Sequence, residues 1–173
     1  QYLHSKHIVH RDLKSLNVLI DDKFHACIGD FGFSKDTTED ELITKNVGTP
    51  FWMAPEMAMS NCYTSKVDVY SYGIILWETS SGLFPQTNES IQSKMSNSKP
   101  VLPFTTPLGV RELFDACCSF EPENRPSFDE IVRKFMTGKV LLNGADEKRF
   151  MEYVKETVGN QKVGTIEYKV NSG

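Results

Sequence analysis

The sequence predicts a mainly α-helical protein that carries one small β-hairpin, and two patterns lead to this fold class. Two β-prone runs, residues 18–20 and 26–28, flank the turn-forming pair Asp21 and Asp22, which indicates a hairpin. After Ser65, apolar side chains recur at helical spacing as far as a stop signal near residue 82. We therefore expect a long helix with a buried face in the middle of the chain.

Capping and turn signals place the other elements. Ser65 followed three residues later by Asp68 resembles a capping box, and Ser127 followed by Glu130 repeats the pattern, so we expect a helix to begin at each. Residues 29–55 show no sustained period and predict a long loop, a kind of segment that is usually functional. The remaining expected helices are a last turn at residues 2–4, one helix around residues 90–95, one at residues 111–119 and a tail helix at residues 146–158.

One stretch near the start of the chain groups side chains that suit phosphoryl transfer. Asp12 supplies a carboxylate, Lys14 a cation and Asn17 an amide, and the expected hairpin can bring Asp30 next to Asn17. Asparagine and aspartate oxygens are hard ligands that suit Mg²⁺. Asp12 can accept a proton from a hydroxyl, and Lys14 can neutralise a phosphoryl group. Gly32 lets the backbone bend beside the metal-binding aspartate.

These residues form three ordered motifs that resemble those of a protein-kinase family. The run His10–Asn17 matches H-R-D-L-K-x-x-N, residues 30–32 match D-F-G, and residues 54–56 match A-P-E. The sequence resembles the C-terminal lobe of a eukaryotic protein kinase over residues 1–138, and we interpret residues 139–173 as a separate C-terminal tail. The three motifs in order are far more specific than any one of them.

The resemblance implies roles for the residues of the reaction. Asp12 would be the catalytic base, and Lys14 would contact both the γ-phosphate of ATP and Thr49. Asn17 and Asp30 would hold Mg²⁺. The residues implied to bind ATP and Mg²⁺ are Leu19, which would lie under the adenine ring, with Lys14, Asn17 and Asp30.

The resemblance also implies structural roles. His10 and Phe31 would stack in a hydrophobic spine whose base is Asp68, and Gly32 completes the D-F-G motif. Glu56 and Arg125 would form a buried ion pair that holds the activation segment to the lobe.

A phosphate-binding cluster is implied by two cations. Arg11 and Lys35 stand where the family binds an activation-loop phosphate, which forms strong hydrogen bonds with such a cluster. Thr44 is the first candidate acceptor, and Thr37 and Thr38 are the alternatives.

The same motifs suggest the substrate class. Lys14 in the catalytic loop and the sequence G-T-P-F-W-M-A-P-E at residues 48–56 look like serine/threonine kinases, most of all the tyrosine-kinase-like group. The expected function is transfer of the ATP γ-phosphate to serine or threonine hydroxyls of a protein substrate. A tyrosine or dual-specificity kinase is the alternative.

The N-terminal lobe of such a kinase is not part of this sequence. Only nine residues precede His10, and they hold no Gly-rich loop, strand lysine or helix glutamate. We therefore expect a partial catalytic domain with little or no activity alone, and an exposed apolar surface where the other lobe would sit. The alternative is a non-catalytic scaffold or regulatory binding module.

Composition excludes other classes. The 173 residues carry a formal net charge of −4, which disfavours general nucleic-acid binding. No apolar run reaches membrane-spanning length, and the four cysteines lack the C-x-x-C spacing of a zinc site. We expect a reduced, cytoplasmic protein with no membrane segment, although attachment to a membrane receptor through upstream sequence stays open.

Overall fold

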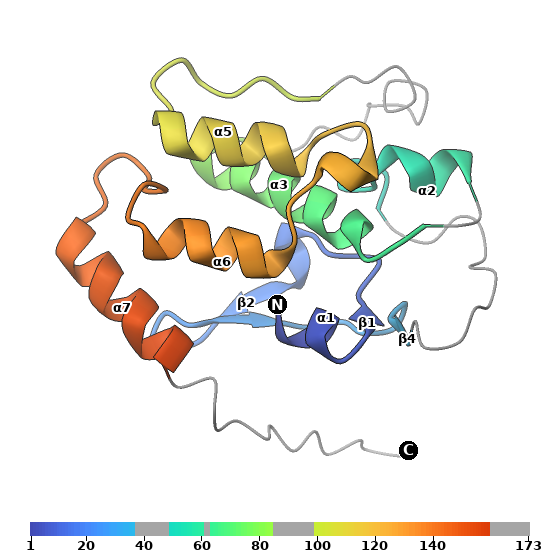
Figure 1. The fold of residues 1–173 in the computed structure, drawn as a ribbon, viewed down its shortest axis with the longest axis horizontal. Coiled ribbons are helices and arrows are strands. Elements are labelled where there is room, and N and C mark those ends of the chain that lie inside the picture. The colour runs from blue at the N-terminus through green and yellow to red at the C-terminus, as the bar shows by residue number, and fades with distance from the viewer. Residues whose placement is uncertain (37–48, 61–62, 85–98, 160–173) are drawn as a thin grey trace.

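The computed structural model describes residues 1–36, 49–60, 63–84 and 99–159 of the chain. Helices dominate it, and strands are few and short (Figure 1). The expected mainly helical class with a small hairpin is confirmed. The expected helix around residues 90–95 lies outside the described residues, as do Thr37, Thr38 and Thr44.

The elements follow one another along the chain as α1 (Tyr2–Ser5), β1 (Ile8–Val9), η1 (Ser15–Asn17), β2 (Val18–Ile20), β3 (Ala26–Ile28), β4 (Lys35–Asp36), α2 (Pro55–Met59), α3 (Lys66–Ser81), α5 (Leu108–Cys117), η2 (Pro122–Asn124), α6 (Phe128–Met136) and α7 (Glu147–Gly159). Here η marks a 3₁₀ helix.

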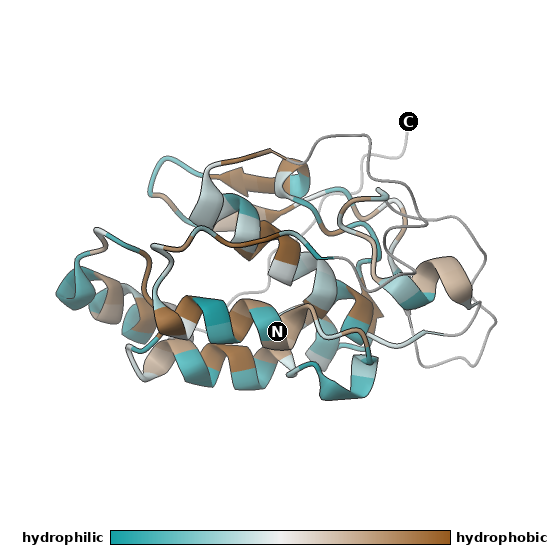
Figure 2. Ribbon diagram, turned by 90° about the horizontal axis from the view of Figure 1, so that it is seen from above, coloured by the Kyte–Doolittle hydropathy of each residue, from teal (hydrophilic) through white to brown (hydrophobic). Residues whose placement is uncertain are grey.

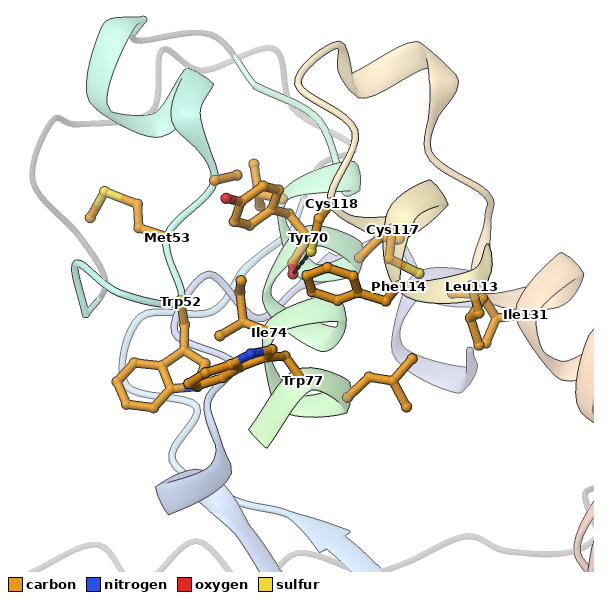
Figure 3. Close-up of a cluster of buried hydrophobic side chains, with 14 of the residues drawn as sticks. Trp52, Met53, Tyr70, Ile74, Trp77, Leu113, Phe114, Cys117, Cys118 and Ile131 are labelled. Carbon is orange, nitrogen blue, oxygen red and sulfur yellow. Dashed lines mark hydrogen bonds between the residues drawn. The ribbon is translucent and has the colours of Figure 1, made fainter. Parts of the chain in front are cut away.

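Helix α3 is the central element of the core. Buried residues lie on all of its faces, and it packs closely against α5 (Figure 3). Gly73 permits this approach, because a Cβ there would lie 2.6 Å from Cys118 Sγ and 2.9 Å from Cys117 Cβ. Burial raises the pKa of the Cys117 thiol to about 12, so this cysteine is an inert packing residue. The expected buried helix is confirmed, and it ends at Gly82 in the left-handed conformation.

The hairpin of β2 and β3 is confirmed, and a second small sheet was not predicted. Strands β2 and β3 pair antiparallel with Leu19 opposite Cys27. Strand β1 pairs with β4, which sets Val9 opposite Lys35. Each strand of this second sheet has two residues, too few for an alternating pattern to appear in the sequence. Helix α2 was missed as well, because its five residues begin at Pro55 and carry no apolar period.

One of the two expected capping boxes is wrong. Ser127 and Glu130 form the reciprocal bonds of a capping box at the start of α6. The side chain of Ser65 makes no cap bond at the start of α3. The carboxylate of Asp68 instead accepts hydrogen bonds from two backbone N–H groups of the loop at residues 10–17, which lie 57 and 58 residues away in the chain.

Residues 139–159 dock on the helical domain instead of extending away from it. Val140 joins the main hydrophobic cluster, and Val154 of α7 is buried. The ring of Phe150 lies 6.0 Å from that of Phe135, so α7 packs beside α6 (Figure 1). The chain crosses α5 at Gly109, where a Cβ would lie 2.0 Å from the Lys139 carbonyl oxygen.

Candidate active site

The loop from His10 to Asn17 is held to α3 by one buried carboxylate. Asp68 Oδ2 accepts the backbone N–H of His10 at 2.8 Å, and Oδ1 accepts that of Arg11 at 2.9 Å. His4 Nε2 lies 2.8 Å from Oδ2 of the same carboxylate. Arg11 has φ +68°, a conformation that costs energy for a residue with a side chain. The two bonds to Asp68 therefore stabilise a strained turn directly before Asp12.

Asp12, Lys14 and Thr49 form a closed triangle of hydrogen bonds. Lys14 Nζ donates to Asp12 Oδ2 at 2.7 Å and to Thr49 Oγ1 at 2.9 Å. The Thr49 hydroxyl donates to Asp12 Oδ1 at 2.9 Å. The Asp12 side chain is 4% exposed and that of Lys14 is 17% exposed. The structure thus brings together three predicted site residues from two segments separated by 35 residues.

Asn17 links the loop to the D-F-G segment. Its Nδ2 donates to the Asp12 carbonyl at 2.9 Å, which leaves the amide oxygen as the group that can bind a cation. Its backbone carbonyl accepts the N–H of Gly29 at 2.8 Å. Asp30 is the residue after Gly29, so this bond ties the start of the D-F-G segment to the loop. Asn17 is buried and Asp30 is exposed.

Asp30 occupies a strained turn supported by the histidine of the loop. It has φ +57°, outside the regions that residues with side chains prefer. His10 is 1% exposed, and its Nε2 lies 3.0 Å from the Gly29 carbonyl oxygen. The rings of His10 and Phe31 lie 5.2 Å apart, and Gly32 donates a long 3.4 Å bond to Asp30 Oδ1. The expected contact of His10 with Phe31 is present, and Asp68 supports it from α3.

The donor set suits Mg²⁺. An amide oxygen from Asn17 and a carboxylate from Asp30 are the hard oxygen ligands that this ion takes together with phosphate and water. No group of three or more histidine, cysteine, aspartate or glutamate side chains could hold a metal within the described ranges.

The two expected phosphate-binding cations come from β4 and from the loop that follows β1. The pairing of β1 with β4 sets Lys35 opposite Val9, two residues before Arg11. Arg11 Nε donates to the Phe33 carbonyl. Burial raises the pKa of Tyr63, and the positive charge of Arg11 opposes that rise.

Glu56 and Arg125 form the predicted ion pair. Arg125 Nη1 donates to Glu56 Oε1 at 2.6 Å and Nη2 to Oε2 at 2.8 Å, a bidentate geometry. The Arg125 side chain is fully buried and that of Glu56 is 13% exposed. The guanidinium also donates to backbone carbonyls and lies 5.0 Å from the Tyr70 ring centroid. This pair joins α2 to the loop before α6.

Leu19 lies on an exposed apolar surface of the hairpin. Ile20 and Phe24 of the hairpin, and Leu16 of η1 before it, are also exposed, at between 61% and 85%. Figure 2 shows hydrophobic colouring along the strands of this hairpin. The sequence predicts an exposed apolar surface where an N-terminal lobe would sit, and the position of that surface stays a prediction.

Glu78 is the site residue that sequence reasoning missed. It is 8% exposed and its carboxylate bonds to Ser15 of the catalytic loop and to Trp52 of the segment after Thr49. A charged residue directly after the apolar run of α3 is the one signal in the sequence that could have found it.

Comparisons with known proteins identify the family of the chain. Residues 1–135 match the family model described as protein tyrosine and serine/threonine kinase, so the chain belongs to the eukaryotic protein kinase family. A probable serine/threonine-protein kinase of Dictyostelium discoideum is 42% identical over 136 residues, which are 76% of this chain and 15% of that protein. A serine/threonine/tyrosine-protein kinase of Arabidopsis thaliana is 42% identical over 137 residues, 76% of this chain and 35% of that protein.

A third relative is named for dual specificity. A dual specificity protein kinase of Dictyostelium discoideum is 39% identical over 145 residues, 80% of this chain and 19% of that protein. The chain therefore spans between about a seventh and about a third of these relatives. Among the described residues, no helix is both long enough and apolar enough to cross a membrane.

Proposed function

We propose that this chain is the C-terminal lobe of a catalytically competent protein kinase that transfers the γ-phosphate of ATP to serine or threonine hydroxyls of a protein substrate. The observation that carries the proposal is the triangle of Asp12, Lys14 and Thr49. A buried carboxylate, a cation and a hydroxyl in mutual contact support a site at which a substrate hydroxyl would meet a phosphoryl group.

Each residue of the triangle has a chemical task, and that of Thr49 is to position the substrate. Asp12 accepts the proton of the attacking hydroxyl, since an ionised carboxylate within hydrogen-bond reach is a suitable general base. Lys14 neutralises charge on the phosphoryl group and keeps Asp12 oriented. Asn17 and Asp30 would hold Mg²⁺, which supplies charge neutralisation at the phosphates of ATP when bound. Leu19 would contact the adenine ring.

The choice of serine and threonine rests on Lys14 and on the names of the relatives. Lys14 bonds to Thr49, the first residue of the segment that leads to α2, and the Lys14 and G-T-P motifs resemble the tyrosine-kinase-like group. Two of the relatives are named for tyrosine or dual specificity, so a dual-specificity kinase is the second candidate. Phosphoamino-acid analysis of a labelled protein substrate distinguishes the two.

We also propose that a preceding N-terminal lobe covers the apolar hairpin. The exposed side chains of Leu19, Ile20 and Phe24 in the hairpin, and of Leu16 before it, support this, because a lobe that packs there would remove apolar surface from water. The isolated 173 residues would then have little activity, and a lobe that acts only as a scaffold is the alternative. Retention of Asp12, Asn17 and Asp30 favours catalysis over the scaffold.

Regulation and location complete the proposal. Phosphorylation of Thr44, or of Thr37 or Thr38, would provide a ligand for Arg11 and Lys35. Mass spectrometry of the active protein tests this, and the absence of phosphate between residues 34 and 49 would contradict it. A cytoplasmic location is consistent with the free cysteines among the described residues.

The decisive experiment replaces the proposed base. In the protein translated from the complete open reading frame, Asp12→Asn keeps the shape of the side chain and removes the base, so turnover should fall by about 10²–10⁴. Asp22→Asn, the same change at an exposed hairpin position, is the control and should leave turnover unchanged. Transfer of labelled γ-phosphate measures both, and a near-normal rate for Asp12→Asn would overturn the assignment.

A further inference from the structure

Glu78 in the last turn of α3 receives one hydrogen bond from each of two separate segments. Ser15 Oγ donates to Glu78 Oε1 at 2.8 Å. The indole Nε1–H of Trp52 donates to Glu78 Oε2 at 2.8 Å. The two donors are 37 residues apart in the chain, and no hydrogen bond between their side chains is seen in the described structure. One carboxylate therefore connects them.

The two donors lie close in the chain to Lys14 and Thr49, the two residues that form the triangle with Asp12. Ser15 follows Lys14 directly, so its side chain limits where the Lys14 backbone can lie. The Trp52 backbone N–H donates to the Thr49 carbonyl at 3.1 Å, so Trp52 closes a turn that begins at Thr49. Glu78 thus restrains the segments that carry Lys14 and Thr49, while its own two hydrogen bonds go to Ser15 and Trp52.

An apolar residue would pack at this position with less cost. Burial of a carboxylate is unfavourable unless hydrogen bonds compensate it, and the C-terminal end of a helix carries a partial negative charge that repels it further. The indole N–H of Trp52 is only a donor, so it needs an acceptor. Ser71 adds a second tie, because its hydroxyl donates to the Trp52 carbonyl at 2.8 Å. Glu78 and Ser71 of α3 thus each bind Trp52, one through its indole and the other through its backbone carbonyl.

We propose that Glu78 is a positioning residue for phosphoryl transfer, which sets the triangle of Asp12, Lys14 and Thr49 by holding Ser15 and Trp52. This proposal rests on the proposed kinase function. Loss of both bonds lets the two segments shift independently, and a displacement of about 1 Å at a reacting group can cost about 10²-fold in rate. ATP binding, which involves the hairpin, should change little.

The chemistry of glutamine provides a matched test. In Glu78→Gln, the amide oxygen still accepts from Trp52 and the amide nitrogen donates to Ser15, whose hydroxyl can also accept. In Glu78→Leu both bonds are lost while an apolar side chain of similar size remains. Ile74→Val, a buried position one turn earlier in α3, controls for a general loss of stability.

The kinetic experiment uses the protein from the complete open reading frame. We expect Glu78→Leu to lower kcat by about 10- to 100-fold with the KM for ATP changed less than about threefold, because the lost interaction positions reacting groups. Glu78→Gln and Ile74→Val should stay within about threefold of the parent kcat. Ser15→Ala should lower kcat in the parent and have no further effect in the Glu78→Leu background.

A spectroscopic signal tests the bonds independently of activity. The indole ¹H–¹⁵N resonance of Trp52, assigned through Trp52→Phe, should move upfield and exchange faster in Glu78→Leu but not in Glu78→Gln. The indole of Trp77 donates to the Val101 carbonyl at 3.0 Å and serves as the internal reference, because Glu78 takes no part in that bond.

The outcomes separate this proposal from the kinase function. An unchanged kcat in folded Glu78→Leu, an equal loss in Glu78→Gln, or an equal loss in Ile74→Val would each overturn the positioning role. If Asp12→Asn leaves phosphate transfer unchanged, the kinase function itself is wrong, and the Trp52 resonance then decides whether the bridge exists.

Discussion

The catalytic loop and the hairpin are neighbours in the chain, yet the fold holds them in different ways. The loop from His10 to Asn17 is fixed by side-chain bonds to the buried carboxylates Asp68 and Glu78 of α3. The hairpin of β2 and β3 is held mainly by its own backbone pairing, and Leu19 and Ile20 are largely exposed. If the proposed function is right, the residues proposed to transfer the proton are held rigidly, whereas the surface proposed to contact the adenine ring stays open to a partner.

The largest effect on stability is expected at the pair of Glu56 and Arg125. Glu56→Ala leaves the guanidinium buried without its carboxylate, which typically costs about 3–5 kcal/mol. Urea unfolding of the 173-residue chain measures the loss. Glu123→Ala, the same change at an exposed position of η2, should alter the unfolding free energy by less than about 0.5 kcal/mol. Similar losses of unfolding free energy in the two variants would contradict a stabilising role of the pair.

A smaller loss is expected where the catalytic loop meets α3. Asp68→Asn replaces one carboxylate oxygen by an amide NH₂, so either His10 or Arg11 loses the acceptor of its backbone N–H. One buried unsatisfied donor costs about 1–3 kcal/mol. Asp115→Asn changes an exposed ion pair with Lys99 and should cost less than about 1 kcal/mol. Equal unfolding free energies for the two variants would contradict the anchoring role of Asp68.

One substitution made in both regions sharpens the comparison. Ile74 in α3 is fully buried and Ile20 in the hairpin is 61% exposed. Ile74→Val should therefore cost about 0.5–1.5 kcal/mol, whereas Ile20→Val should stay within about 0.5 kcal/mol. Both are measured by urea unfolding of the isolated chain. If a preceding lobe covers the hairpin, the cost of Ile20→Val should rise in the longer protein.

Local patterns predicted the elements whose causes are local. The turn pair Asp21 and Asp22 located the hairpin, the apolar period located α3, and Ser127 with Glu130 located the start of α6. Motif order predicted that Asp12 and its partners would meet, and they do. The contacts of Asp12, Lys14 and Thr49 and the pair of Glu56 and Arg125 were therefore predictable from sequence, whereas the roles of these residues in catalysis stay predictions.

Features that depend on distant partners were not predictable in this way. The sheet of β1 and β4 consists of two-residue strands that exist only because residues far apart in the chain meet. Asp68 has the sequence signature of a capping box but bonds to the loop from His10 to Asn17. The backbone N–H groups of His10 and Arg11 need a buried acceptor, and this distant need is not visible in the local pattern. Glu78 carries no motif, so its two partners became visible only in the fold.

The smallest expected effect separates hydrogen bonding from burial. Glu130 bonds to a backbone N–H as Asp68 does, but it is exposed to solvent. The bond from the Ser127 backbone N–H lowers the pKa of Glu130 below its ordinary value. A carboxyl whose pKa is lower in the folded state adds stability above its unfolded pKa, and that stability is lost as the pH falls through the folded pKa.

Glu130→Gln removes this titration and keeps an acceptor at the start of α6. The unfolding free energy of the parent should therefore fall relative to that of Glu130→Gln as the pH is lowered below about 4, near the ordinary pKa of glutamate. Urea unfolding at several pH values measures the difference, and parallel profiles would show that the capping bond does not depend on charge. The contribution should be well below that of Asp68, because water competes for an exposed carboxylate and cannot reach the buried one.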